Sequence, residues 1–174
     1  MSHGQDTSDW FRDPPRRRVG VHALIRRGPT LLGVTRPYRE SVSPWGLPGG
    51  SVAPNELRRA ALSRHLATRL GLPAVRLGRL LVIDDVPEKP GQHLEGTNYV
   101  YEVEIPDDVE LTVTEVGGFG EATWIDLNQL GDFVVGHPLR RIQESLLAAE
   151  TGRVAELFLG DPQYGSQAVS GPAA

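Results

Sequence analysis

Residues 47–72 read LPGGSVAPNELRRAALSRHLATRLGL, and this stretch decides the fold of the chain. Its pattern predicts a helix from Asn55 to Leu70, because Asn55 can cap the first turn and Gly71 is suited to end the last one. Glu56 would favour the positive N-terminus of that helix. The apolar stripe of the predicted helix consists of Leu57, Ala61, Leu66 and Leu70.

The same stretch carries a motif with fixed spacing. Five residues separate Gly50 from Glu56, and seven more separate Glu56 from Arg64, without a gap. This spacing resembles the Nudix box, written G-x5-E-x7-R-E-U-x-E-E-x-G-U, where U is an aliphatic residue. The resemblance covers about residues 19–150 and implies an α/β fold, the Nudix fold, an α/β/α sandwich with a mixed β-sheet. The further matches to the box are Leu66, Gly71 and Leu72.

The elements around the box are consistent with that fold. The expected strands are 19–25 and 30–36, which form a hairpin, followed by 76–86, 97–105 and 122–127. A second helix is expected over 138–150. We expect a polar N-terminal extension over 1–18, one Nudix-fold domain over 19–159, and a tail rich in Gly, Pro, Ser, Gln and Ala over 160–174.

Three departures from the box change its chemistry. Where the family has the glutamates that hold Mg²⁺ or Mn²⁺ over a diphosphate, this chain has His65, Thr68 and Arg69. The formal charge of these positions changes from −3 to +1 with neutral histidine. Hard divalent cations prefer oxygen ligands, carboxylates above all. We therefore expect no metal cofactor, with Mg²⁺ or Mn²⁺ bound only if a displaced site exists.

Further expectations concern the polar residues of this stretch. Glu56 and Arg64 are expected to pair and to act mainly as structural braces, as the resemblance implies. Arg69 is either a solvated arginine near a helix C-terminus or, with His65 and Thr68, a direct ligand for an anion where the family uses a metal.

Other candidates lie outside the box. Trp45, Tyr99 and Phe119 could wall a ligand pocket, although most large aromatic side chains belong to the core. Glu115 and Glu121 are the carboxylates that, with Glu56, could rebuild a displaced metal site. His22 lies on the first expected strand, where alternation leaves open which face of the sheet it occupies.

Composition limits the classes of partner that the chain is expected to bind. The chain has 174 residues, a net charge of −4 and no cysteine, which argues against a broadly basic nucleic-acid surface and excludes thiolate sites. Its apolar runs are too short to span a bilayer. We expect a cytoplasmic protein whose partner is an anionic or nucleotide-like small molecule, and a homodimer stays open. Lys89 is the only lysine among 18 basic residues, a bias typical of GC-rich genomes.

Three function classes remain open. The first is a Nudix-fold protein that has lost metal-dependent hydrolysis and binds a ligand or a protein partner in the old cleft. The second is a divergent hydrolase of a nucleoside diphosphate linked to a group X, with a displaced metal site. The third is an enzyme that performs metal-free chemistry on a small molecule.

Overall fold

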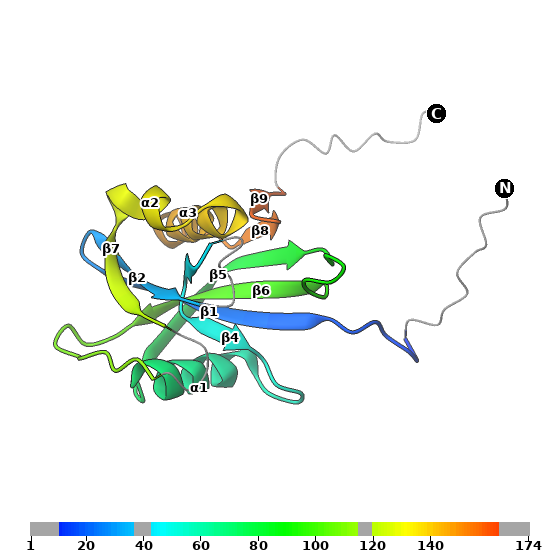
Figure 1. Ribbon diagram of the computed structural model, residues 1–174, viewed down its shortest axis with the longest axis horizontal. Coiled ribbons are helices and arrows are strands. Elements are labelled where there is room, and N and C mark those ends of the chain that lie inside the picture. The colour runs from blue at the N-terminus through cyan, green and yellow to red at the C-terminus, as the bar shows by residue number, and fades with distance from the viewer. Residues whose placement is uncertain (1–10, 37–42, 115–119, 164–174) are drawn as a thin grey trace, which may run out of the picture.

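The computed structural model describes residues 11–36, 43–114 and 120–163 of the chain. Within these residues, the strands form one mixed sheet with helices on both faces, so the expected α/β/α sandwich is confirmed (Figure 1). The helices are α1 (Arg58–Leu70), α2 (Leu130–Phe133) and α3 (Gly136–Thr151), with a 3-10 turn, η2, at Leu127–Gln129. The strands are β1 (Arg18–Arg27), β2 (Thr30–Thr35), β3 (Trp45–Gly46), β4 (Gly49–Ser51), β5 (Arg76–Val86), β6 (Gly96–Glu104), β7 (Ala122–Asp126), β8 (Ala155–Phe158) and β9 (Asp161–Pro162).

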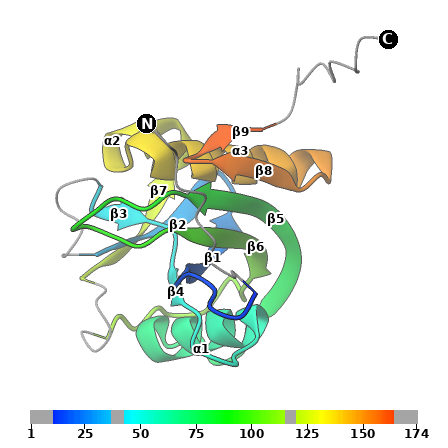
Figure 2. The same ribbon diagram turned by 90° about the vertical axis from the view of Figure 1, so that its right-hand side faces the viewer.

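The sheet combines parallel and antiparallel pairs. Its strand order is β3-β2-β1-β6-β5-β8-β9, while β4 pairs with β1 and β7 pairs with β2. The pairs β1–β6 and β5–β8 are parallel, whereas β5–β6 and β1–β2 are antiparallel. Strand β5 is long and strongly curved, so it connects the layer of α1 with the layer of α3 (Figure 2). Helices α1 and α3 both pack on β1, from opposite faces of the sheet.

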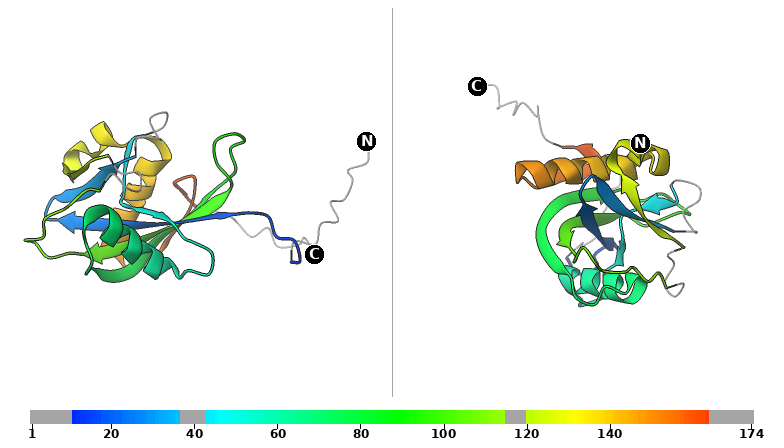
Figure 3. Two further views of the ribbon diagram at one scale, coloured as in Figure 1. Left: turned by 60° about the horizontal axis from the view of Figure 1, so that its bottom comes forward. Right: turned by 90° about the vertical axis from the view of Figure 1, so that its left-hand side faces the viewer.

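Two hydrophobic clusters, one on each face of the sheet, form the core. Successive side chains of a strand point to opposite faces, and β1 follows this rule. Val21 and Ala23 pack in the cluster of α1, whereas Leu24 packs in the cluster of α3. Figure 3 shows α1 and α3 on opposite sides of the strands. The face on which a β1 residue lies therefore decides which helix it meets.

The helix of the box starts later than the sequence predicts. It begins at Arg58, its N-cap is Leu57 without a side-chain cap, and Asn55 is left-handed with φ of 60°. The turn before the helix places Leu57 in solvent, at 78% exposure, so Leu57 is not part of the buried stripe. The end at Gly71, which adopts φ of 65°, agrees with the prediction. The predicted stripe residues that are buried are Ala61, Leu66 and Leu70.

The C-terminal part of the chain contains structure that the sequence did not predict. After α3 the chain adds β8, parallel to β5, and turns into β9. Strand β9 lies within the stretch that was expected to be tail. At the other end, β1 already begins at Arg18 and reaches into the expected extension.

Candidate functional site

The glycines of the box lie on β4, close to the backbone of β1. Gly49 pairs with His22 and Gly50 pairs with Val21. Gly49 adopts φ of 153°, and a Cβ there would lie 2.0 Å from the carbonyl oxygen of Val21. Only glycine allows this approach, so β4 is fixed directly beside β1.

Helix α1 holds β4 through side chains that donate hydrogen bonds. The ring Nε2 of His65 lies 2.8 Å from the carbonyl oxygen of Ser51. Arg69 donates from Nη1 to the carbonyl oxygen of Gly49 at 3.1 Å. Because a carbonyl oxygen only accepts, Nε2 of His65 carries the proton. Two of the three positions that replace the family's glutamates are thus directed at backbone oxygens of β4.

The predicted pairing of Glu56 with Arg64 is present, although Glu56 precedes α1. Arg64 donates from Nε and Nη2 to the two carboxylate oxygens, each at 2.7 Å, and the backbone N–H of Ala53 donates to the same group at 2.9 Å. The bond from Arg64, followed by that from Ala53, lowers the pKa of Glu56 to about 2. The carboxylate also raises the pKa of Arg64. The pair braces the loop before α1 onto the helix.

His65 is buried, with 4% of its surface exposed. Burial is the main cause that lowers its pKa, and the positive charges of Arg69 and Arg64 add to this effect, while the bond to Ser51 opposes it. The imidazole is therefore neutral near pH 7. Among the residues that the structure describes, none is a hydrogen-bond partner of its buried Nδ1. The sequence led us to expect a contact between protonated His65 and an anion. Because the pKa of the buried ring is lowered, such a contact would need a pH below the ordinary histidine range.

Thr68 is exposed, and its hydroxyl donates to the carbonyl oxygen of Arg64 at 2.8 Å, one turn earlier. The C-terminal end of α1 is covered by the segment before residue 115. There, the backbone N–H groups of Thr112 and Thr114 donate to the carbonyl oxygens of Leu70 and Arg69. This segment satisfies carbonyls that a helix end leaves without partners.

The structure places two of the predicted aromatic residues, Trp45 and Tyr99, in different hydrophobic clusters. Trp45 packs edge-on against Phe133, with ring centroids 5.6 Å apart, on the α3 side of the sheet. Tyr99 packs in the α1 cluster, and the guanidinium of Arg58 lies over its ring at 4.1 Å. Phe119 lies outside the described residues. Trp45 and Tyr99 therefore do not wall a common pocket.

Of the three carboxylates proposed for a displaced metal site, the structure describes Glu56 and Glu121. No group of three or more His, Asp or Glu side chains that could hold a metal ion occurs among the described residues. Glu121 is exposed, its backbone N–H is bonded to the hydroxyl of Thr35, and Glu56 is bound to Arg64. Glu115 lies outside the described residues.

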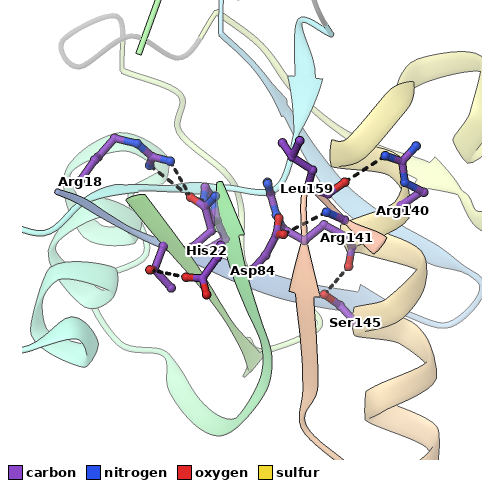
Figure 4. Close-up of polar contacts among 11 residues, drawn as sticks. Arg18, His22, Asp84, Arg140, Arg141, Ser145 and Leu159 are labelled. Atoms are coloured by element: carbon purple, nitrogen blue, oxygen red, sulfur yellow. Dashed lines mark hydrogen bonds and ion pairs between the residues drawn. The ribbon is translucent and has the colours of Figure 1, made fainter. Parts of the chain in front are cut away.

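A polar cavity that the sequence did not predict lies on the α3 side of the sheet. Its volume is about 20 Å³, and its polar lining includes His22, Arg36, Ser43 and Arg141, all of them buried. Arg141, on α3, donates from Nε to Asp84 on β5 at 2.5 Å (Figure 4). A signal was available in the apolar run of β5, LLVIDDV, because an aspartate on a buried strand face needs a cationic partner.

Comparison with known proteins gives the family. The sequence model of the NUDIX domain matches residues 15–148, most of the chain. The chain belongs to the Nudix family. The family resemblance and the fold expected from the box are thereby confirmed.

Known Nudix proteins resemble the chain in sequence and in structure. It is 44% identical over 61 residues to "Putative 8-oxo-dGTP diphosphatase 2" of Mycobacterium tuberculosis, which is 34% of this chain and 43% of that protein. The match thus spans less than half the length of that relative. A MutT Nudix hydrolase from Burkholderia pseudomallei has a TM-score of 0.61 at 25% identity, over 75% of this chain and 98% of that one. An ADP-ribose pyrophosphatase from Streptococcus suis has a TM-score of 0.59 at 14% identity, over 82% and 99%.

Nudix hydrolases typically use Mg²⁺ or Mn²⁺, and the residues of α1 in this chain do not fit such a metal. Arg69 is a permanent cation whose Nη1 is directed at the carbonyl oxygen of Gly49. Nε2 of His65 is a donor toward Ser51 and has no lone pair to offer. Among the described helices, none is long and apolar enough to cross a membrane.

Proposed function

We propose that this Nudix protein does not carry out metal-dependent diphosphate hydrolysis and binds an anionic, nucleotide-like small molecule instead. The observation that carries the proposal is the contact of Arg69 with the carbonyl oxygen of Gly49, at 3.1 Å. It puts a fixed positive charge and a donor where a metal site would need negative charge and acceptors.

Loss of the metal removes two functions at once. A divalent ion polarises phosphoryl oxygens and generates the attacking hydroxide. An arginine can perform the first function, because it stabilises negative charge. It cannot perform the second, because a guanidinium stays protonated and takes no proton from water. His65 donates from Nε2 to Ser51 and only 4% of its surface is exposed, so its basic nitrogen, Nδ1, is shielded from solvent.

The names of the relatives and the charge of Arg69 support the proposed class of ligand. The relatives named above have 8-oxo-dGTP and ADP-ribose in their names, and a solved UDP-X diphosphatase has a TM-score of 0.63 at 16% identity, over 88% of this chain and 70% of that one. A fold that accommodates phosphate-bearing nucleotides in these proteins supports a nucleotide-like ligand here. Arg69 keeps its charge whatever it donates to, so it attracts an anion toward β4.

The test combines turnover with metal binding. Phosphate release from 8-oxo-dGTP, ADP-ribose and a UDP-sugar, with Mg²⁺ or Mn²⁺, should stay at the level of a buffer control, far below the ordinary range of about 1–1000 per second. Calorimetry should show no saturable binding of Mn²⁺, while one nucleotide of the panel should bind in the presence of EDTA. Chelator-sensitive turnover that Glu56→Gln or Glu121→Gln abolishes would establish the divergent hydrolase instead.

A further inference from the structure

Strand β7 is an edge strand of the sheet. It pairs with β2 alone among the described strands, and Figure 1 shows it at the left of the molecule, beside β2. Its register with β2 contains no shift, and its sequence, ATWID, includes neither proline nor lysine. Proteins protect edge strands by short length, prolines, lysines or bulges, because an open edge is a template for another strand. Strand β7 has none of these protective features.

Other edges of the sheet are short or covered by side chains. Strands β3 and β9, at the two ends of the strand order, have two residues each, and β9 contains Pro162. The outer edge of β4 is occupied by α1, because Arg69 and His65 are bonded to the carbonyl oxygens of Gly49 and Ser51. On the side of β7 away from β2, no described residue is hydrogen-bonded to the backbone of the strand.

The alternation of the β2–β7 ladder decides which backbone groups of β7 point outward. Thr35 donates its N–H to the carbonyl oxygen of Glu121 at 2.9 Å, and Leu127 donates to that of Pro29 at 3.0 Å. Along an antiparallel ladder, pairs that exchange hydrogen bonds alternate with pairs that do not. The three residues whose N–H and C=O therefore point away from β2 are Ala122, Trp124 and Asp126.

These three residues fit a second copy of the same strand. If two copies of β7 pair antiparallel about a two-fold axis at Trp124, Ala122 of each copy faces Asp126 of the other. Each facing pair then exchanges two hydrogen bonds, so every outward N–H meets a carbonyl oxygen. Two-fold symmetry requires such a self-complementary patch. No like charges face each other, and the two Trp124 side chains form an aromatic pair, which stabilises neighbouring strands.

The charges beside β7 are complementary in the same pairing. The guanidinium of Arg27 lies over the ring of Trp124, 4.4 Å from its centroid, and no described carboxylate pairs with it. Asp126 accepts from the N–H of Asn128 at 2.8 Å, and no described cation pairs with its carboxylate. In the two-fold pairing, Asp126 of one copy is the diagonal neighbour of Trp124 in the other, within reach of a long side chain. Arg27 and Asp126 would thus attract each other across the axis, twice.

We propose that two copies of this chain associate through β7, so that their sheets join into one continuous sheet across a two-fold axis. This association is independent of the ligand proposed above. A ladder of one short strand per copy is a small interface, so the dimer should dissociate on dilution.

Sedimentation equilibrium between about 1 µM and about 1 mM chain measures the association. We expect a monomer–dimer equilibrium, and a monomer at every concentration would overturn the proposal. Hydrogen exchange then identifies the strand. The outward amides of Trp124 and Asp126 should exchange slowly only at high concentration, whereas those of Thr123 and Ile125, bonded to β2, should be protected at both ends of the range. A dimer without this alternation would place the interface elsewhere and overturn the proposal as well.

Opposite charges at position 122 give a matched pair of variants. Ala122→Glu places a carboxylate opposite Asp126 of the second copy, and Ala122→Lys places an ammonium group there. Glutamate should weaken the dimer and lysine should strengthen it, each by about two- to thirtyfold, because the new charge pair occurs twice. Ala60→Glu and Ala60→Lys, at an exposed position of α1, should change the dissociation constant less than about twofold. Equal effects of the two charges at position 122 would contradict the pairing.

A proline tests the outward N–H directly. Ala122→Pro removes that donor without breaking a bond to β2, and proline is tolerated at such an edge position. It should weaken the dimer about five- to a hundredfold, because one hydrogen bond is lost in each copy, whereas Ala122→Ser keeps the donor and should not. If Ala122→Pro does not fold, the charge variants decide.

The two proposals fail separately. Association is measured without nucleotide or metal, so a chain that stays monomeric refutes the β7 dimer and leaves the proposed function intact. Metal-dependent turnover refutes the proposed function and leaves the exchange pattern of β7 unchanged.

Discussion

The imidazole of His65 occupies the space in which a side chain at Gly50 would lie. A Cβ on Gly50 would lie 2.4 Å from both Cε1 and Nε2 of that ring. The two residues belong to β4 and α1, so this contact lies directly between the glycine strand and the helix. Gly50 thus serves to admit the ring that replaces a family glutamate.

This contact predicts that substitutions at Gly50 and His65 have strongly coupled effects on stability. Gly50→Ala should lower the free energy of unfolding by about 1–3 kcal/mol, since the buried ring has to move. In the background of His65→Ala the same substitution should cost clearly less. Urea unfolding of the four proteins of this cycle measures the coupling. Gly46→Ala is the matched control, because nothing lies within 4 Å of a Cβ there; equal costs at Gly46 and Gly50 would contradict the prediction.

His65 should make the stability depend on pH. Burial lowers its pKa in the folded chain, so the unfolded chain binds more protons as the pH falls. The contribution of neutral His65 is complete above about pH 6.5, the ordinary value, and is lost as the pH falls from there toward the folded pKa. Thermal unfolding at several pH values should show this loss, and His65→Gln should remove it.

The contribution of Glu56 to stability changes over a more acidic pH range than that of His65. Its pKa is about 2 in the folded chain against an ordinary 4.5, so its contribution to stability is present above pH 4.5 and is lost as the pH falls toward 2. In Arg64→Met the largest cause of the shift is absent, and carboxyl NMR should find the pKa of Glu56 closer to 4.5. An unchanged pKa in that variant would show that Ala53, not Arg64, governs the carboxylate.

Restoring the family's glutamates should first destabilise the protein. His65→Glu and Arg69→Glu would direct carboxylates at the carbonyl oxygens of Ser51 and Gly49, which repel them. The variant with glutamate at positions 65, 68 and 69 should therefore have a lower Tm than the native chain, and Mn²⁺ should raise it again. The native chain and Thr68→Glu, an exposed position, should not respond to Mn²⁺. A Mn²⁺-induced rise in the native chain would contradict the absence of a site.

The buried ion pair of Asp84 and Arg141 should tie the C-terminal strands to the core. Asp84→Asn or Arg141→Met alone should each cost about 3–5 kcal/mol, because each leaves a buried group without its partner. The double variant should cost less than the sum of the two. Hydrogen exchange at the amide of Gly160, which donates to Asp84, should speed up in Asp84→Asn. Glu104→Gln, which breaks the exposed pair with Arg76, should cost less than about 1 kcal/mol.

The sequence predicted the features that depend on spacing along the chain. The glycine and glutamate of the box, the helix end at Gly71 and the limits of β5 follow from local patterns. The predicted start of the helix was wrong, because the left-handed turn at Asn55 is stabilised by the carboxylate of Glu56 and by Arg64, eight residues after Glu56. A capping rule weighs local residues and does not include such a contact.

The cavity could not be predicted for a similar reason. Its residues come from β1, from the end of β2, from β3 and from α3, and the register of β1 places His22 on the α3 face. Alternation along the strand left that choice open. The buried partner of Arg141, Asp84, lies 57 residues away in the sequence, so the pair depends on the parallel and antiparallel order of the whole sheet.

The N-terminus of α1 has a consequence for the order of folding. It has no side-chain cap and no acidic residue in its first turn, where Arg58 and Arg59 oppose the helix dipole. Contacts with the sheet compensate: Arg58 lies over Tyr99, and Arg59 donates to the carbonyl oxygens of Leu77 and Gly78. A peptide of residues 53–72 should therefore show little helical circular dichroism. We expect pulse-labelling hydrogen exchange to find α1 protected only after β5 and β6 have paired, so the segment with the family motif is among the last to form.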